Sequence, residues 1–341
     1  MSRWSEDGWT RAVPPLQVDR AALDALLGPL GPCAGWRRLS LGKANTNLRV
    51  ERRHGPPLVV RVYQRDAHAL AREKALWSLV DPLVPVPALR REGRVAGAPA
   101  AVLDFIHGTH PAHAMATAPQ DAQAIGHALG STLARLGAVA VDGVGRYAPD
   151  LTLARRFDSV AHSFEDLMRW SLRRGRARKR LGPERRRALL HALPLALERL
   201  APLEDHPGLA HGDYKSSNLL LVRDEGWRVA AVLDWELAAP FTPMLDVALL
   251  MRHRDALPTS FQDGFAAGYR SGGAWLPDDW RAVSRVVDLM SLIGLLNAST
   301  DRPRLYAAAV QRVDATLAML QPRREVLPNP YRPLVAKPQP C

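Results

Sequence analysis

The sequence predicts an α+β fold with two lobes, in which a small antiparallel sheet is followed by a mainly helical lobe. Short β-branched runs separated by Gly and Pro turns are concentrated in residues 36–106, as expected for strands of a hairpin-connected sheet. Beyond residue 107 the apolar residues recur mostly at helical spacing. A length of 341 residues allows one such two-lobed domain with a sizeable core.

The first lobe follows an N-terminal extension, residues 1–35, in which Asp19 is placed to cap a short helix that ends near Leu27. A second helix is expected at residues 67–79, because prolines follow it at positions 82, 85 and 87. Five strands are expected, at residues 36–41, 47–52, 58–63, 88–91 and 98–106.

The second lobe, residues 107–320, is predicted to be helical with one interruption at residues 209–236. There, two short apolar runs at 219–222 and 229–233 predict a buried hairpin. The tail, residues 321–341, is rich in Pro and Arg, so we expect it to lack fixed structure. Helices are expected at residues 119–139, 153–174, 183–200, 243–252, 259–269, 279–297 and 302–320.

The chain is basic, with a formal charge of +12 from 46 Lys and Arg against 34 Asp and Glu. The densest basic run is Arg169–Arg187, which we interpret as a solvated face between two helices. Polyanion binding by this run is the alternative. Because a basic run alone is a weak indication, we expect no nucleic-acid partner.

Composition also bears on location. No apolar stretch reaches 18 residues without a charge, so we expect no membrane span. The N-terminus carries Glu6 and Asp7 and has no apolar segment of the secretory type. Cys33 and Cys341 are the only cysteines and indicate no disulfide framework. A cytoplasmic location is the simplest expectation.

The stretch Leu209–Glu236 carries the polar residues that point to chemistry. Asp213 follows His-Gly, Asn218 follows five positions later, and Asp234 ends the second strand of the predicted hairpin. The hairpin would return Asp234 to the side of Asn218. Phosphoryl transfer needs such a set, because one acid aligns a hydroxyl while an amide and a second acid hold Mg²⁺ on the nucleotide phosphates. We therefore assign Asp213 as candidate base and Asn218 and Asp234 as candidate metal ligands.

Two features of the first lobe would serve a nucleotide. The loop with Gly42, Lys43 and Asn45 could lie over phosphates, although an ordinary hairpin is the simpler interpretation of that loop alone. Arg61 on the third strand and Glu73 on the following helix could form the cation–carboxylate pair that contacts phosphates. The alternative is that both are surface residues.

The end of the fifth strand would connect the lobes, and backbone groups at Asp104 and Ile106 could hydrogen-bond a purine there. Three histidines follow, at positions 107, 110 and 113. We interpret them as solvent-exposed loop residues, with a metal site as the alternative.

Three further residues of the central region have expected supporting roles. His211 would fix the conformation of the loop, and Asp246 would buttress it from a helix with apolar neighbours. Glu236 would assist the metal or cap the next segment.

These blocks, HGDYKSSNLL at 211–220, VLDWE at 232–236 and Asp246-Val247-Ala248, resemble the aminoglycoside phosphotransferase and choline kinase-like family, small-molecule relatives of protein kinases. Weaker similarity lies at 41–50 and 102–108, and the resemblance covers about residues 36–320. It implies a protein-kinase-like fold, Asp213 as base, Asn218 and Asp234 as Mg²⁺ ligands, and ATP or GTP between the lobes.

The chain departs from the family pattern at two places. Arg61 stands where the better-known antibiotic kinases carry Lys, and Phe241-Thr242-Pro243 stands where Gly-Asp-Pro is frequent. The first departure bears on phosphate binding, and the second on the loop next to the acceptor.

We therefore expect an Mg²⁺-dependent O-phosphotransferase that uses ATP or GTP and acts on a small hydroxyl-bearing molecule. Residues 36–106 would bind the nucleotide, and residues 107–320 would supply catalysis and acceptor binding. The alternative function is a kinase-like nucleotide-binding regulatory protein without transfer activity. The sequence names neither the acceptor nor the oligomeric state.

Overall fold

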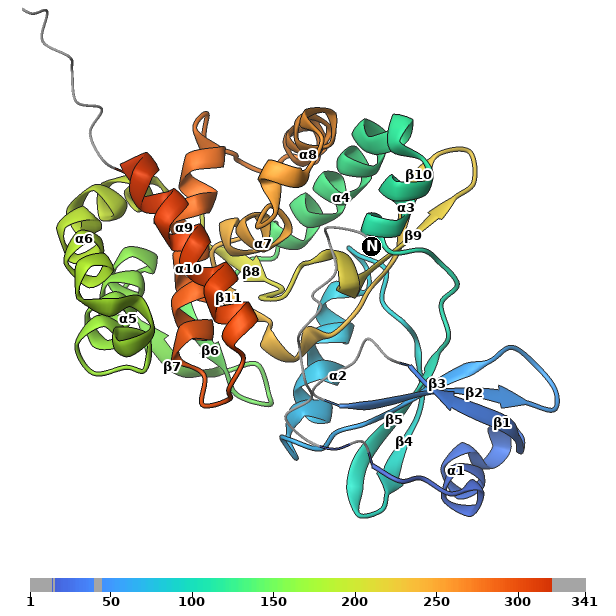
Figure 1. Ribbon diagram of the computed structural model, residues 1–341. Coiled ribbons are helices and arrows are strands. Elements are labelled where there is room, and N and C mark those ends of the chain that lie inside the picture. Colours follow the sequence, from blue (N-terminus) through green and yellow to red (C-terminus); the bar gives the residue numbers. More distant parts are fainter. Residues whose placement is uncertain (1–13, 15, 40–44, 321–341) are drawn as a thin grey trace, which may run out of the picture.

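The computed structural model describes residues 14, 16–39 and 45–320. Within them the chain forms the two predicted lobes, a sheet lobe followed by a mainly helical lobe (Figure 1). Five strands, β1 (Cys33–Arg38), β2 (Thr46–Arg52), β3 (Leu58–Val62), β4 (Leu89–Val95) and β5 (Ala98–Asp104), form an antiparallel sheet in the order β1-β2-β3-β5-β4.

The sheet of the first lobe is buried on both faces. Alternation along β5 sends Val102 toward α1 (Arg20–Leu27), and sends Ala101 and Leu103 to the opposite face, where α2 (Ala69–Val80) packs. As predicted, Asp19 caps α1, accepting the Ala22 N–H at 2.7 Å. The face toward α2 shares one continuous core with the helical lobe.

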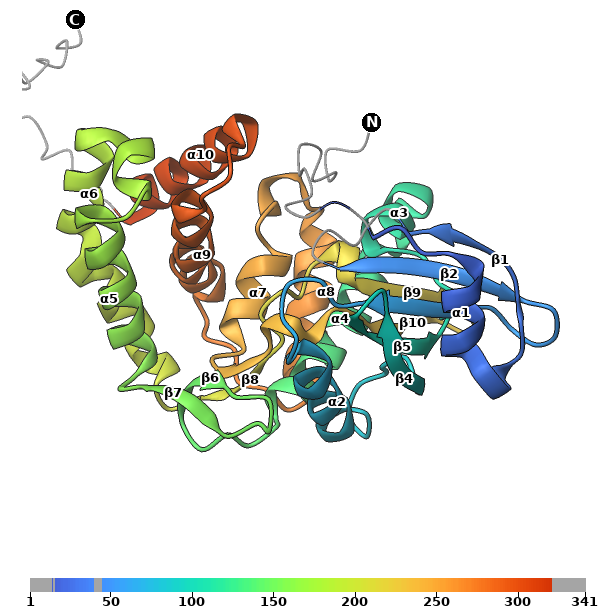
Figure 2. The same cartoon turned by 90° about the horizontal axis from the view of Figure 1, so that it is seen from below.

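The helical lobe has two parts (Figures 1 and 2). Near the first lobe, α4 and α8 lie side by side, whereas α5, α6, α9 and α10 pack together at the far end. The helices are α3 (Pro111–Thr117), α4 (Ala122–Gly137), α5 (Val160–Arg173), α6 (Ala177–Leu200), α7 (Met244–Leu250), α8 (Thr259–Ser271), α9 (Trp280–Asn297) and α10 (Pro303–Leu320). Within the described ranges no helix is long and apolar enough to cross a membrane.

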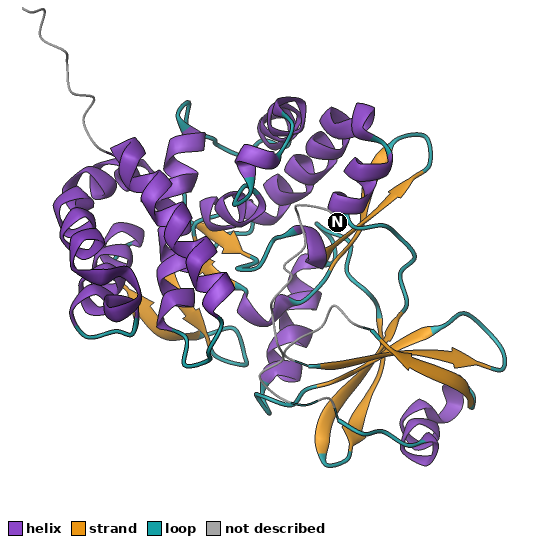
Figure 3. Ribbon diagram, in the orientation of Figure 1, coloured by secondary structure: helices purple, strands orange, loops and turns teal. Residues whose placement is uncertain are grey.

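Short strands interrupt this lobe in three antiparallel pairs (Figure 3). One pair is the predicted hairpin, which links Asn218 to Asp234. The pairs are β6 (Val144–Tyr147) with β7 (Leu153–Phe157), β8 (Gly208–Ala210) with β11 (Ala239–Phe241), and β9 (Leu219–Arg223) with β10 (Trp227–Val232).

The predicted helix at residues 153–174 is wrong in its first part. Residues 153–157 form β7, and α5 begins only after Ser159, whose side chain accepts the His162 N–H at 3.0 Å. The Ser159 hydroxyl is thus the N-cap of α5 and fixes where the helix begins after β7.

The basic run Arg169–Arg187 is only partly the solvated face that we expected. It runs from the last turns of α5 into α6, where Gly182 adopts φ 73° and kinks the helix just before Pro183. Arg180 donates to the carbonyls of Leu296 and Ala298, at 2.6 and 2.8 Å. A second arginine of the run, Arg185, forms a bidentate pair with Asp314 on α10. These two arginines tie α6 to its neighbours.

Candidate functional site

The loop that follows β8 and begins at His211 is held by hydrogen bonds to a buried carboxylate. Asp246, on α7, is inaccessible to solvent and accepts the backbone N–H groups of His211 at 2.6 Å and Gly212 at 2.9 Å. Gly212 has φ 77°, and a Cβ there would lie 2.4 Å from the Leu237 carbonyl oxygen. This is the supporting contact predicted for Asp246, and it requires glycine at position 212.

His211 fixes the loop from the inside. Burial lowers the pKa of its imidazole to about 4, so the ring is neutral. Its Nε2 lies 3.0 Å from the Leu233 carbonyl and therefore carries the proton, while Nδ1 accepts the Asp213 N–H at 3.2 Å. The neutral ring thereby connects the loop to the end of β10.

The predicted base and the predicted amide ligand are in direct contact. The Asn218 Nδ2 donates to the Asp213 Oδ2 at 2.7 Å and to the Asp213 carbonyl at 2.9 Å. Lys215 Nζ lies 3.1 Å from Oδ1 of the same carboxylate. Burial raises the pKa of Asp213, whereas Lys215 lowers it. Because the Asn218 Nδ2 donates to Asp213 twice, the Asn218 Oδ1 points away from this carboxylate and could coordinate a cation.

Asp234 reaches this pair through the hairpin. The Leu233 N–H donates to the Asn218 carbonyl at 2.8 Å, and Asp234 then turns out of the strand in a left-handed conformation at φ 70°. Such a conformation is uncommon outside glycine and is frequent at functional sites. The hairpin thus places Asp234 beside Asn218, as its length predicted.

Arg61 joins the two lobes at Asp234. Its Nη2 lies 2.6 Å from the Asp234 Oδ1 and 3.0 Å from the Glu73 Oε1. β3 is an inner strand and only 7% of Arg61 is exposed, so the alternative of a surface position for Arg61 is wrong. Glu73 is also buried, and its burial raises the pKa to about 7, opposed chiefly by Arg61.

Tyr63 completes this network and was not predicted from the sequence. Its hydroxyl donates to the Glu73 Oε2 at 2.5 Å, and the Arg61 guanidinium lies 5.2 Å from its ring centroid. The available signal was spacing, because residues two apart on a strand face the same side. Tyr63 therefore follows Arg61 toward the same helix.

The predicted phosphate loop is only partly visible. Gly42 and Lys43 lie outside the described residues, whereas Asn45 is buried and its Nδ2 donates to the Glu236 Oε2 at 3.2 Å. This contact joins the first lobe to the segment that follows Asp234.

The predicted purine-binding segment is the end of β5. The Asp104 N–H donates to the Ala88 carbonyl at 3.0 Å, and its carboxylate forms a bidentate pair with Arg90. Asp104 would thus not offer its N–H to a purine. Ile106 follows in a partly buried position.

The oxygen donors around Asp234 fit the Mg²⁺ that the resemblance implies. Within the described part of the chain, no three His, Cys, Asp or Glu side chains converge as a metal site. Mg²⁺ at nucleotide sites takes one or two protein oxygens together with phosphates and water. The Asn218 Oδ1 and the Asp234 carboxylate supply such a pair.

Among the residues that the structure describes, the three histidines do not converge on one point, and the expectation of exposed loop residues holds only for His107. His110 is partly buried at the start of α3, and its Nδ1 lies 3.2 and 3.0 Å from the carbonyls of Ser216 and Leu219. His113 is exposed but lies within α3. His110 thus contacts the segment that follows Asp213, within the second lobe.

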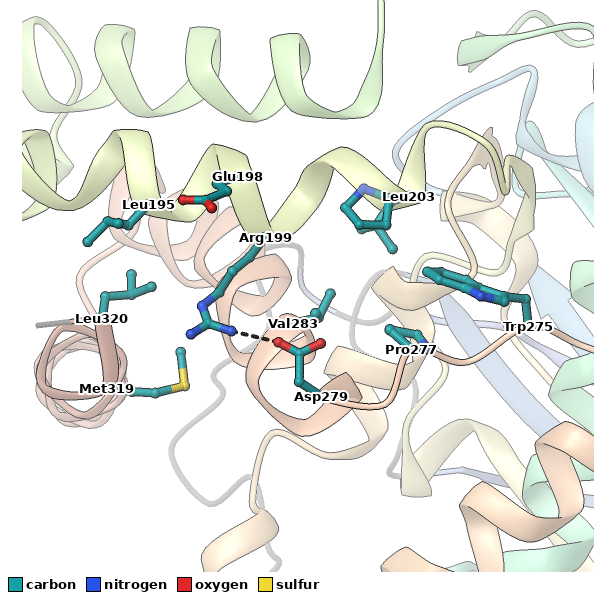
Figure 4. A pocket seen from close by; sticks show the side chains of 11 residues that line it. Leu195, Glu198, Arg199, Leu203, Trp275, Pro277, Asp279, Val283, Met319 and Leu320 are labelled. Carbon is teal, nitrogen blue, oxygen red and sulfur yellow. Dashed lines mark hydrogen bonds and ion pairs between the residues drawn. The ribbon is translucent and has the colours of Figure 1, made fainter. Parts of the chain in front are cut away.

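A cavity of about 620 Å³ lies elsewhere, between the ends of α6, α9 and α10 (Figure 4). Its wall includes the Arg199–Asp279 ion pair, at 2.6 Å, and Trp275, which stacks on His206. None of the predicted site residues lines this cavity. It is therefore separate from the candidate active site.

Comparisons with known proteins agree with this geometry. The model of the phosphotransferase enzyme family matches residues 35–284. No curated protein sequence matches the chain. Among solved structures, a thermostable variant of aminoglycoside phosphotransferase APH(4)-Ia, crystallised with ADP and hygromycin B, superposes with a TM-score of 0.62 at 17% identity, covering 88% of this chain and 97% of the other.

A second solved structure has a similar fold. The macrolide 2′-phosphotransferase MphH from Brachybacterium faecium superposes with a TM-score of 0.58 at 20% identity, over 89% of this chain and 98% of that one. At these identities the superpositions confirm the predicted two-lobed, kinase-like fold.

Proposed function

The chain belongs to the phosphotransferase enzyme family, and from this we propose that it transfers a phosphoryl group from ATP or GTP to a hydroxyl of a small molecule. The observation that carries the proposal is the 2.7 Å contact between Asn218 and Asp213. It places a hydrogen-bonded carboxylate beside the hairpin end that carries Asp234. An acid, an amide and a second acid thus occupy one site, as phosphoryl transfer requires.

In this proposal Asp213 aligns the acceptor hydroxyl and accepts its proton. Asn218 holds the carboxylate, and Lys215 lies 3.1 Å from its other oxygen. The Asp246 carboxylate, which accepts two backbone N–H groups of this loop, would hold the loop in position for the acceptor. Catalysis would be mainly positioning, because a loose phosphoryl-transfer transition state asks little covalent chemistry of the protein.

Asn218 and Asp234 would hold Mg²⁺, which neutralises charge on the nucleotide phosphates when it is bound. Arg61 would contact the phosphates in place of the usual Lys. Its Nη2 contacts Asp234 and Glu73, while its Nε is buried and has no hydrogen-bond partner among residues 14, 16–39 and 45–320. A guanidinium suits this double task, since it presents several donors in one plane.

The related structures support the choice of donor and acceptor class. APH(4)-Ia was crystallised with ADP and hygromycin B, and MphH is a macrolide 2′-phosphotransferase. By analogy we propose a nucleotide donor and a hydroxyl-bearing small molecule as acceptor. A transfer screen with ATP and GTP against antibiotics, amino alcohols, sugars and nucleosides would identify both.

The Asp213→Asn variant tests the mechanism. Removing the proton acceptor should lower kcat by about 10²–10⁴-fold while leaving the fold and nucleotide binding intact. The exposed turn residue Asp224, changed to Asn, is the matched control and should keep full activity. Steady-state kinetics on the acceptor found in the screen provide the measurement, and undiminished turnover in Asp213→Asn would contradict the proposed role.

The alternative function, nucleotide binding without transfer, is favoured by one contact. Arg61 pairs directly with Asp234, so the predicted metal ligand is already neutralised by a protein cation. The two functions differ in turnover. Protection by Mg²⁺-ATP against heat, with no product from any acceptor class in the screen, would support the regulatory alternative.

A further inference from the structure

We propose that Glu236 is a positioning residue that ties the two lobes together over the nucleotide site, through Asn45 and Arg61. The role rests on the proposed function, because it concerns where the nucleotide would bind. The sequence suggested a metal-assisting or capping role for Glu236. The contacts instead direct its carboxylate toward the first lobe.

The contacts of Glu236 lead to that lobe. Its Oε2 accepts a hydrogen bond from the Asn45 Nδ2 at 3.2 Å and lies 3.9 Å from the Arg61 Nη2. Asn45 directly precedes β2, and Arg61 is in the middle of β3. One carboxylate oxygen of the second lobe therefore accepts a hydrogen bond from Asn45 and forms a longer ion pair with Arg61, both in the first lobe.

Burial strengthens the hydrogen bond between Asn45 and Glu236. Asn45 is 4% exposed and the Glu236 side chain 23% exposed, so water competes only weakly for the bond between them. A hydrogen bond to an ionised group that is sheltered from solvent is stronger than a neutral or exposed one.

Both chain neighbours of Glu236 are held in place by the second lobe. The Glu236 carboxylate therefore has a defined position relative to that lobe. The preceding Trp235 is 1% exposed, donates its Nε1–H to the Val232 carbonyl at 3.0 Å, and packs against the His211 ring. The following Leu237 carbonyl lies against Gly212. Because this segment abuts the loop that carries Asp213, the Asn45–Glu236 bond sets where the start of β2 stands relative to Asp213.

The first test measures the separation of the lobes without any nucleotide. Spin labels at the exposed positions His54 and Glu225, each changed to Cys in a Cys341→Ser background, report the distance distribution by pulsed electron paramagnetic resonance. Glu236→Ala and Asn45→Ala should each broaden the distribution, and the double variant should broaden it no further. Glu198→Ala, an exposed carboxylate on α6, is the control and should leave it unchanged.

The second test measures ADP binding by calorimetry, with Mg²⁺ and with EDTA. Loss of the Asn45–Glu236 bond should raise the Kd for ADP about tenfold in each single variant and also in the double variant. The increase should be the same with Mg²⁺ and with EDTA. An effect of Glu236→Ala that appears only with Mg²⁺ and adds to that of Asn45→Ala would assign Glu236 to the metal and overturn the proposal.

An unbroadened distance distribution in Glu236→Ala would also overturn it. The proposed function fails differently, by absence of phosphate transfer or of ADP binding in the unaltered chain. The distance measurement decides the role of Glu236 in that case as well.

Discussion

Tyr63 determines how the buried carboxylate of Glu73 meets Arg61. One oxygen of Glu73 faces the Arg61 guanidinium at 3.0 Å, and the other accepts the Tyr63 hydroxyl at 2.5 Å. A buried carboxylate has given up its hydration, and its hydrogen-bond partners compensate for that loss. Removing one partner leaves part of the loss uncompensated. Glu73 is thus held between the Arg61 guanidinium and the Tyr63 hydroxyl, one at each carboxylate oxygen.

The Tyr63→Phe variant should therefore lose about 1.5–3 kcal/mol of unfolding free energy, since a hydrogen bond to a charged group is removed. Urea denaturation measures this loss. Tyr306→Phe is the matched control, because the Tyr306 hydroxyl donates to a neutral carbonyl, that of Thr300, and its loss should cost about 1 kcal/mol. Equal losses in the two variants would mean that the hydrogen bond from Tyr63 to Glu73 contributes no more than one to a neutral carbonyl, which would contradict the prediction.

His211 contributes a pH dependence of known sign. Burial lowers its pKa from 6.5 to about 4 in the folded chain. Between these values the unfolded chain binds a proton that the folded chain does not, so this residue favours unfolding as the pH falls, by up to about 3 kcal/mol. Above pH 6.5 the imidazole is neutral in both the folded and the unfolded chain, so this loss of stability is absent there.

Nitrogen-15 NMR of the imidazole tests this prediction for His211 alone, which matters because Glu73, with its pKa raised to about 7, acts with opposite sign in the same range. The spectrum should show the tautomer protonated at Nε2 and no titration above about pH 5. Titration of His211 near pH 6.5 would show that the ring is open to water.

Among the secondary-structure elements, the crossing of α4 and α8 depends on four glycines. A Cβ at Gly126 or Gly130 would lie 2.2 Å from a carbonyl oxygen of α8, and one at Gly264 or Gly268 would lie 2.1 Å from a carbonyl of α4. The two backbones are thus in contact. Since α4 also packs on β8 and β10, this close crossing supports the site from beneath.

Gly130→Ala should accordingly destabilise the fold by at least about 2 kcal/mol, because neither backbone can withdraw without opening the core. Gly294→Ala is the matched control. Gly294 lies exposed within α9 with nothing near its added Cβ, so alanine should stabilise the helix by about 0.5–1 kcal/mol. Thermal unfolding of both variants measures the difference, and a stable Gly130→Ala variant would contradict the close crossing.

Predictability from the sequence differed between elements for physical reasons. The strands β2, β3 and β5 and the β9–β10 hairpin were predicted near their observed positions, because apolar or β-branched runs between Gly and Pro turns are local signals. β1 begins at Cys33, three residues before the predicted start, and β4 continues to Val95, four residues beyond the predicted end. The hairpin of β6 and β7 was missed because Leu153–Phe157 carries two arginines on a largely exposed strand, which leaves no alternating apolar pattern. α3 was missed because it has only seven residues.

At the scale of the whole molecule, the sequence predicted that the polar residues of the candidate site lie close together, but it did not predict the contacts that depend on lobe docking. Asp213, Asn218 and Asp234 share one short stretch, so spacing sufficed to bring them together. Asn45 and Glu236 are 191 positions apart, and their bond exists only because the lobes pack as they do. Arg61 was expected near phosphates, yet its pairing with Asp234 across the lobes was not.

A ligand held between two lobes stabilises both, and this leads to the last prediction. Mg²⁺-ATP at about 100 times its Kd should stabilise the chain by about 2.7 kcal/mol and raise Tm by about 4 °C. Because Asp234 would hold the metal, EDTA or the Asp234→Asn change should remove most of this shift. Differential scanning fluorimetry measures it, with Asp224→Asn on the β9–β10 turn as the control that keeps the full shift.

The metal dependence is what makes the measurement specific. The chain is strongly basic, so a polyanionic nucleotide can also bind loosely to surface arginines. Such binding would weaken with salt but would not need Asp234. A shift that survives both EDTA and Asp234→Asn would therefore place the nucleotide outside the site between the lobes, whereas a shift lost in both would tie it to the carboxylate that Arg61 holds.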